Sequence, residues 1–251
     1  MKLLIVIPAR FASTRFPGKP IALLGGKPVI QYAYENAVRA SVGPVVVATD
    51  DERILKVVEA FGGLAVMTSP EHPSGTDRVK EAMDKFMPDC DAVINLQGDE
   101  PFVPVELLEE IAKRLEISSD EEIVTVAVRA KREEISGNPN IVKVVVDSNM
   151  RALYFSRASI PYLREGGQEC GVFRHWGIYA FRKKAINRFV SLPESPLEKC
   201  EKLEQLRALE NGMNIFVIIT SHSSIGIDTQ QDLREAEKFL IGSTTSNLKR
   251  G

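Results

Sequence analysis

The sequence contains little cysteine and no long hydrophobic run. Its three cysteines, Cys90, Cys170 and Cys200, lie far apart and form no Cys-x-x-Cys motif or Cys/His cluster, which argues against a disulfide framework and a zinc site. The apolar stretch at the N-terminus has only about six residues before Pro8, too few for a signal sequence or a membrane span. We therefore expect a soluble, cytoplasmic protein with reduced cysteines.

An excess of charge of either sign is also lacking. The chain has 32 Lys and Arg against 34 Asp and Glu, which gives a net charge of -2. Such a balance favours neither nucleic acid nor an anionic membrane as a partner, so any anion-binding site must be local. The 251 residues, 44% of them hydrophobic, suffice for one large domain or for a domain with an inserted lobe.

Short β-branched runs alternate with helical patterns through the first half of the chain, which is typical of a mostly parallel sheet covered by helices. The expected strands are 2–8, 44–49, 63–67 and 91–96, and the expected helices are 28–40, 51–60, 76–86 and 104–116. Ligands of such sheets bind beyond the carboxyl ends of the strands. This rule places residues 8–19, 49–50 and 95–100 on one rim.

The pattern changes near residue 123, where strands follow one another without regular crossover helices. The expected elements are strands 123–128, 142–146, 152–155, 176–181 and 215–220, a helix at about 195–211, and a last helix ending near 240. We predict an α/β fold with a Rossmann-like, doubly wound, mostly parallel sheet and a smaller mixed α+β lobe. The core comprises 1–122 with about 215–242, the lobe about 123–214, and 243–251 form a disordered tail.

The loop after the first strand has the composition of a phosphate-binding site. Arg10, Arg15 and Lys19 lie among Pro, Gly, Ser and Thr, so cations and backbone N–H groups could converge on a polyanion. The loop matches neither Walker A nor Gly-x-Gly-x-x-Gly, which disfavours a nicotinamide oxidoreductase. A solvated basic loop is the alternative interpretation.

Two isolated acids follow apolar segments. Asp99 comes directly after Gly98, behind the strand that ends near 96, and Asp228 lies far along the chain. Mg²⁺ prefers a few carboxylates together with phosphate oxygens, and a pair of carboxylates could serve an in-line displacement. The alternatives are a solvated turn for Asp99 and a helix N-cap for Asp228 or Thr229.

A third polar segment, residues 72–78, precedes a predicted helix. Ser74 or Thr76 could cap that helix, and Arg78 would then lie in its first turn. An arginine there opposes the helix dipole, which favours a ligand role over capping alone.

Ordered motifs across residues 1–240 resemble the 3-deoxy-manno-octulosonate (Kdo) cytidylyltransferase family of sugar nucleotidyltransferases. The motifs lie at 7–10, 13–15, 17–20, 74–78, 95–101, 152–157, 175–182, 204–207 and 226–229. The first is shared by sugar nucleotidyltransferases broadly, whereas the later ones point to the Kdo branch. Trp176 departs from the pattern, since a small aliphatic residue is more usual there.

This resemblance implies a nucleotidyltransferase-type fold, CTP and Kdo as substrates, Mg²⁺ as cofactor, and a homodimer formed through the second lobe. The implied contacts to the nucleotide are Arg10, Ser13 and Lys19 for the phosphates and Ala9, Ser74, Arg78 and Gln97 for the cytosine. The implied metal ligands are Asp99 and Asp228. The implied contacts to the sugar acid are Arg157, His175, Tyr179, Glu204 and Gln205. The product would supply lipopolysaccharide synthesis.

The sugar-site residue types also suit an anionic, hydroxylated acid. Arg157 can pair with a carboxylate at two points, and His, Tyr, Glu and Gln can satisfy hydroxyls. His175 could instead be a hydrogen-bonded core residue on one face of a strand. Glu204 and Arg207, three residues apart, could be only a surface ion pair.

The predicted reaction is attack of the anomeric hydroxyl of Kdo on the α-phosphorus of CTP, with departure of pyrophosphate. Arg10 and Lys19 would offset the charge that builds on the leaving group, and no side chain is assigned as general base. The alternatives are another sugar nucleotidyltransferase, including one for an amino-substituted Kdo analogue, and a non-catalytic regulator that binds CTP.

Overall fold

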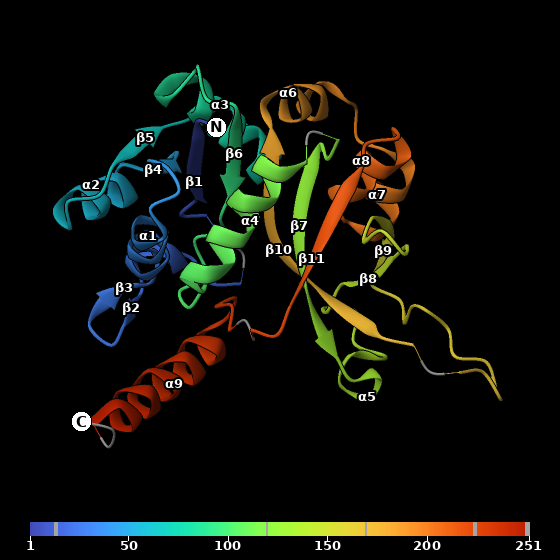
Figure 1. The fold of residues 1–251 in the computed structure, drawn as a ribbon. Coiled ribbons are helices and arrows are strands. Elements are labelled where there is room, and N and C mark those ends of the chain that lie inside the picture. The colour runs from blue at the N-terminus through green and yellow to red at the C-terminus, as the bar shows by residue number, and fades with distance from the viewer. Residues whose placement is uncertain (13–14, 119, 169, 223–224, 249–251) are drawn as a thin grey trace. The chain divides into compact units, whose positions relative to one another are not determined.

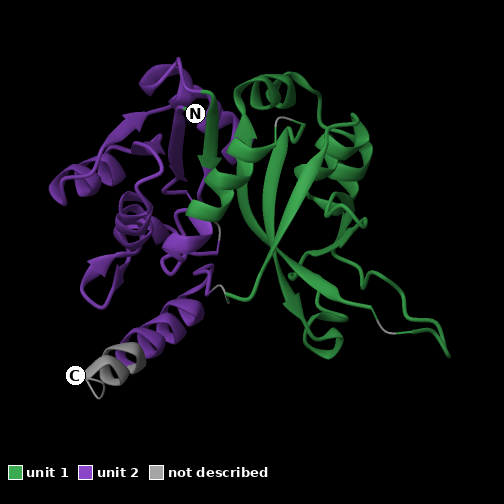
Figure 2. Cartoon of the chain, in the orientation of Figure 1, with its two compact units in different colours: residues 1, 91–94, 109–223 green, residues 2–90, 95–108, 224–251 purple. Residues whose placement is uncertain are grey.

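The chain folds into two compact units in the computed structural model, which describes residues 1–12, 15–118, 120–168, 170–222 and 225–248. Unit 1 comprises Met1, Asp91–Ile94 and Glu109–Ser223, and unit 2 comprises Lys2–Cys90, Asn95–Leu108 and Ser224–Gly251 (Figure 2). Residues 91–94, 109–122 and 215–223, all expected in the nucleotide-binding core, thus belong to unit 1. Within the described residues, no helix is long and apolar enough to cross a membrane.

Unit 2 contains a parallel sheet with helices between its strands (Figure 1). The strands are β1 (Leu3–Ala9), β4 (Val45–Thr49) and β5 (Ala65–Met67), and β4 pairs with both others. The helices are α1 (Val29–Ala40), α2 (Glu52–Ala60) and α3 (Gly75–Phe86). Leu4 through Ile7 are fully buried, because β1 is an unbroken apolar run of the kind found in strands covered on both faces.

Unit 2 has a second apolar cluster and several further elements. They are η1 (Lys19–Ile21), the hairpin β2 (Leu23–Leu24) with β3 (Lys27–Pro28), and helix α9 (Gln230–Leu248). The cluster contains Phe16, Leu24, Val29, Ile227 and Ala236. It therefore joins the loop after β1 to the segment that precedes α9. Helix α9 continues to Leu248, beyond the expected end near 240 and into the segment predicted as a disordered tail.

Unit 1 contains a mixed sheet with the strand order β11-β7-β10-β6. The strands are β6 (Ala92–Asn95), β7 (Ile123–Ala130), β8 (Lys143–Val146), β9 (Ala152–Ser156), β10 (Val172–Arg182) and β11 (Ile215–Thr220). Strand β11 runs parallel to β7, β10 runs antiparallel to β7, and β8 pairs antiparallel with β9 and β10. The predicted α/β fold class with a mixed second part is confirmed.

The helices of unit 1 differ from the prediction, which gave no helix at 132–135 or at 183–191. They are α5 (Arg132–Ile135), α6 (Lys183–Ser191), α7 (Pro196–Glu201) and α8 (Gln205–Glu210), while α4 (Val105–Ile117) spans the boundary between the units. The single helix expected at 195–211 is wrong. Lys202 adopts a left-handed conformation, with φ of 53°, and ends α7. Arg157 donates from Nε to the Glu201 carbonyl oxygen at 2.8 Å, which helps to hold this break.

Candidate active site

A cleft of about 370 Å³ lies at the carboxyl end of β1 in unit 2. Seven residues that the sequence analysis singled out line it: Ala9, Arg10, Arg15, Lys19, Gln97, Asp99 and Asp228. Ala9 is buried at the end of β1, whereas Arg10 is exposed. Ser13, the third predicted phosphate contact, lies outside the described residues. The strand-end rule thus predicted where these groups, apart from Asp228, gather.

Backbone hydrogen bonds bring the distant segments to this cleft. The Leu96 N–H donates to the Val6 oxygen at 3.0 Å, and the Ile227 N–H donates to the Asp99 oxygen at 2.9 Å. Gly98 approaches β1 so closely that a Cβ there would lie 3.3 Å from Ile7 Cγ2 and 3.4 Å from the Pro8 oxygen. A Cβ at this position would require its neighbours to shift by a few tenths of an ångström, so glycine suits the close approach of residues 97–99 to β1.

Lys19 joins the two predicted metal ligands. Its Nζ lies 2.5 Å from Asp99 Oδ2 and 3.0 Å from Asp228 Oδ1, and its side chain is 14% exposed. Burial alone would lower the pKa of Lys19, but the two carboxylates outweigh that effect and raise the pKa above 10.5. The exposed Arg15 lies 3.1 Å from the other oxygen of Asp228. Asp228 thus contacts two cations, and it shares one of them, Lys19, with Asp99.

Asp99 and Asp228 suit a magnesium ion, although they do not form a complete site alone. Among the described residues, no group of three or more His, Cys, Asp and Glu side chains gathers in a metal-binding arrangement. Mg²⁺ is usually held by one or two carboxylates, with phosphate oxygens and water as the other ligands. Both carboxylates already approach one ammonium group, so a single cation can reach both.

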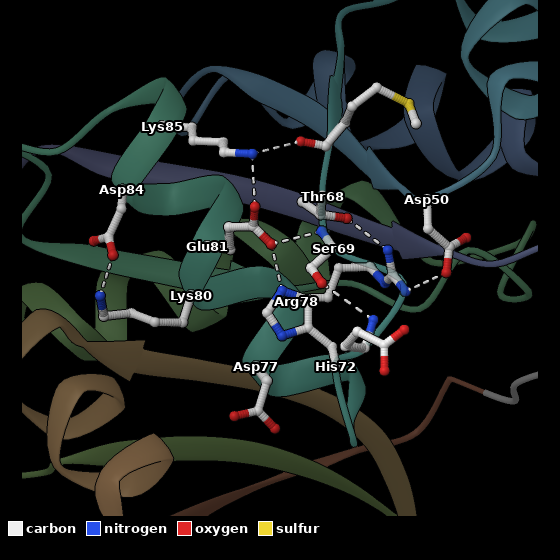
Figure 3. Close-up of polar contacts among 12 residues, drawn as sticks. Asp50, Thr68, Ser69, His72, Asp77, Arg78, Lys80, Glu81, Asp84 and Lys85 are labelled. Atoms are coloured by element: carbon white, nitrogen blue, oxygen red, sulfur yellow. Dashed lines mark hydrogen bonds and ion pairs between the residues drawn. The ribbon is translucent and has the colours of Figure 1, made fainter.

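The predicted cytosine contacts at the start of α3 have protein partners. Ser74 Oγ caps the helix by accepting from the Asp77 N–H at 3.2 Å, so the capping interpretation is confirmed. Arg78 is 5% exposed and donates to Asp50 Oδ2 at 2.6 Å and to Thr68 Oγ1 at 2.5 Å (Figure 3). These two bonds fix the guanidinium group of Arg78. Elsewhere on the rim, Gln97 Nε2 donates to Asn95 Oδ1 at 3.1 Å.

In unit 1, the geometry around His175 assigns its protonation state. The Thr125 hydroxyl donates its only proton to the Ile178 oxygen at 2.8 Å, so His175 Nε2, 3.0 Å from Thr125 Oγ1, must be the donor in that pair. Dense packing, including the Phe155 ring at 5.0 Å, desolvates the imidazole and lowers its pKa to about 3. His175 is therefore neutral near pH 7, with Nδ1 as an acceptor.

Tyr179 lies beside His175, with the two ring centroids 5.4 Å apart. Its hydroxyl oxygen is buried without a hydrogen bond of normal geometry to the described residues. Burial raises the pKa of Tyr179 well above 10, and the charge on Glu204 adds to this rise. Tyr179 therefore remains a protonated donor. Three of the five predicted sugar-acid contacts, His175, Tyr179 and Glu204, are thus close together, and Gln205 is buried at the start of α8.

The fifth predicted sugar-acid contact, Arg157, supports the break between α7 and α8. Besides its bond to Glu201, it donates from Nη1 to the Pro139 oxygen at 2.9 Å and from Nη2 to the Lys202 oxygen at 3.4 Å. These bonds use three of its five N–H donors. Its guanidinium group thus retains two further N–H donors.

Sequence reasoning missed the partners of several site residues. Thr125 was not singled out, and Asp50 was placed only on the rim, because the three-dimensional register alone brings them beside His175 and Arg78. The surface location considered for Arg207 is wrong: it is buried and binds Glu198 with both Nε and Nη2, at 2.8 and 2.6 Å. For Glu198, the partner of Arg207, the sequence did contain a signal, because its spacing from Ser195 is typical of a capping box at a helix start.

Comparisons with known proteins agree with this geometry. Residues 4–215 match the family described as Cytidylyltransferase. The chain is 49% identical to a 3-deoxy-manno-octulosonate cytidylyltransferase of Thermodesulfovibrio yellowstonii, covering 96% of this chain and 98% of the relative. It is 46% identical to an 8-amino-3,8-dideoxy-manno-octulosonate cytidylyltransferase of Shewanella halifaxensis, covering 96% and 99%.

Solved structures show the same relationship. A CMP:2-keto-3-deoxy-manno-octonic acid synthetase in complex with CTP superposes with a TM-score of 0.92 at 40% identity, covering 97% of this chain and all of the other. A 4-diphosphocytidyl-2C-methyl-D-erythritol synthase of Anaerococcus prevotii, 20% identical with a TM-score of 0.62 over 95% and 98% of the two chains, shares the fold.

Proposed function

The chain belongs to the cytidylyltransferase family, and from that premise we propose that it transfers CMP from CTP to Kdo and releases pyrophosphate. The observation that carries the proposal is the meeting of Lys19, Asp99 and Asp228 in the cleft beyond β1. A triphosphate needs cations and a metal site at one place, and these three side chains provide both.

The chemistry of this site is positioning and charge neutralisation. Lys19 stays protonated at neutral pH because its pKa is raised, and with Arg10 it would offset the charge on the departing pyrophosphate. Asp99 and Asp228 would hold Mg²⁺. When bound, that ion would neutralise phosphate charge and acidify a coordinated hydroxyl. The reaction needs no covalent intermediate, and we assign no side chain as general base.

The residues of unit 1 have complementary roles toward the sugar acid. Neutral His175 would accept a hydrogen bond from a sugar hydroxyl through Nδ1, and Tyr179 would donate one. The two N–H donors that Arg157 retains would pair with the carboxylate. Glu204 and Gln205 would contact further hydroxyl groups. This set of donors and acceptors suits an anionic, hydroxylated substrate.

An amino-substituted Kdo is a second candidate acceptor. Relatives from Shewanella are named for the 8-amino-3,8-dideoxy sugar at 45–46% identity, within the 44–49% range of relatives named for Kdo. Overall identity therefore does not separate the two substrates. From the family resemblance we also propose a cytoplasmic homodimer whose product supplies lipopolysaccharide synthesis, and sedimentation of the purified protein tests the dimer.

Pyrophosphate release tests the reaction. The purified protein is incubated with Mg²⁺, one of the four nucleoside triphosphates, and Kdo or its 8-amino analogue. We expect release only when CTP and a sugar acid are both present, and loss of release in Asp99→Asn. Asp84→Asn, which alters an exposed carboxylate on α3, is the matched control. Binding of CTP without release would instead indicate a regulator.

A further inference from the structure

The loop from Thr68 to Ser74, between β5 and α3, is held by side chains of the helix that follows it (Figure 3). Glu81 Oε2 accepts from the Ser69 N–H at 2.8 Å and also contacts His72 Nε2. Its other oxygen lies 2.6 Å from Lys85 Nζ. One carboxylate of α3 thus contacts both Ser69, at the beginning of the loop, and His72, in its middle.

The spacing of these side chains shows that one face of α3 serves this purpose. Asp77, Glu81 and Lys85 are four residues apart and so share a helix face. Asp77 Oδ2 accepts from Ser74 Oγ at 2.6 Å, and Lys85 Nζ donates to the Met67 oxygen at 3.0 Å. Every residue of the stripe therefore contacts the loop or the strand before it. By contrast, the neighbouring Lys80 and Asp84 pair with each other.

The Glu81 carboxylate is ionised at neutral pH. Burial opposes its ionisation, but hydrogen bonds from Lys85, the Ser69 N–H and His72 outweigh burial and lower its pKa to about 2. A charge-assisted hydrogen bond to a backbone N–H is stronger than a neutral one. The conformation of the loop therefore depends on the ionised Glu81 carboxylate.

The loop leads directly to the nucleotide cleft. A Cβ built on Gly75, the first residue of α3, would lie 3.9 Å from Cγ of Pro8, which lines the cleft. At the other end of the loop, Thr68 accepts from Arg78. Ser74 and Arg78, the predicted cytosine contacts, therefore depend on the conformation of the same short segment.

We propose that Glu81 is a positioning residue for the nucleotide: together with His72 it fixes the loop 68–74 and so presents Ser74 and Arg78 to the base without touching it. The inference rests on the proposed function. Because the loop is already fixed in the free protein, CTP binding does not lose free energy to the conformational entropy of ordering it. Loss of Glu81 then weakens CTP binding and leaves the chemical step unaltered.

The first test separates KM from kcat. Glu81→Gln removes the charge at nearly constant shape, and we expect the KM for CTP to rise about fivefold to tenfold, with kcat and the KM for the sugar acid unchanged. Asp84→Asn on the same helix is the control and should behave as the wild type. If the two variants have the same KM for CTP, or if kcat falls while that KM is unchanged, the proposal is overturned.

The second test does not depend on turnover. Hydrogen exchange of residues 68–75 without nucleotide should be faster in Glu81→Gln than in Asp84→Asn, and equal rates would overturn the proposal. His72→Ala, which removes the contact from the loop side, should also raise the KM for CTP and replaces Glu81→Gln if that variant does not fold. If the wild type binds CTP but releases no pyrophosphate, the proposed function fails, and the calorimetric Kd for CTP replaces KM in deciding the role of Glu81.

Discussion

Mild acid should destabilise the folded protein through His175. The imidazole is neutral in the folded state, where burial lowers its pKa from 6.5 to about 3. Because the folded-state pKa is the lower one, the unfolded chain binds more protons below pH 6.5. The contribution of His175 to stability is therefore complete above pH 6.5 and is lost as the pH falls from 6.5 toward 3.

The size of the effect at about pH 5 follows from this window. At that pH the unfolded imidazole is mostly protonated and the folded one is still neutral. This pH lies about 1.5 units below the unfolded-state pKa of 6.5. At about 1.36 kcal/mol per unit, the free energy of unfolding is therefore lower by about 2 kcal/mol. A folded-state pKa one unit higher would give nearly the same value, since the folded imidazole would still be neutral at this pH.

Urea unfolding of the wild type and of His175→Gln at about pH 7.5 and about pH 5 measures the effect. Glutamine retains an N–H donor for Thr125 but does not titrate. The wild type should lose about 2 kcal/mol more unfolding free energy between the two pH values than the variant does. His222→Gln, at an exposed histidine, should resemble the wild type. Equal pH dependence in the wild type and His175→Gln would refute the reasoning about burial.

Two further perturbations test other parts of the site. Lys19→Met should lower kcat for pyrophosphate release by roughly 10² to 10³, because it removes a cation from the phosphate cleft; a wild-type kcat would contradict its role. Because the pKa of Lys19 is raised, its ion pairs stabilise the wild type below pH 10.5 and are lost only as the pH rises above it. Arg207→Met should cost about 3–5 kcal/mol in urea unfolding by leaving Glu198 buried without its partner. Adding Glu198→Leu should recover much of the lost unfolding free energy. If the double variant loses as much unfolding free energy as Arg207→Met does, that result would argue against burial of the pair.

The location of the cleft could be predicted because it depends on strand order alone. β1 and β4 contain the β-branched runs Ile5–Ile7 and Val45–Val47, and in a parallel sheet their carboxyl ends share one rim. Lys19 and Asp99 follow from that rule. Asp228 joins them through the backbone bond from Ile227 to Asp99, which no local pattern encodes, so its place came from the family resemblance.

The details that escaped prediction depend on tertiary contacts. Lysine has no preference for the left-handed conformation that ends α7 at Lys202, and Arg157, which follows β9 and is far away in the sequence, stabilises that break. Helix α9 likewise extends past 240 while Phe239 packs against Phe102, with ring centroids 5.0 Å apart. Helix propensity is only a weak guide where such contacts decide.

The product of the reaction tests the central claim most directly. Phosphorus NMR of a mixture of protein, Mg²⁺, CTP and Kdo should show the three CTP signals giving way to pyrophosphate and one phosphodiester signal, with no change in the Asp228→Asn variant. Persistence of the CTP signals with the wild type, or release of pyrophosphate without a new phosphodiester, would contradict cytidylyl transfer to this sugar acid.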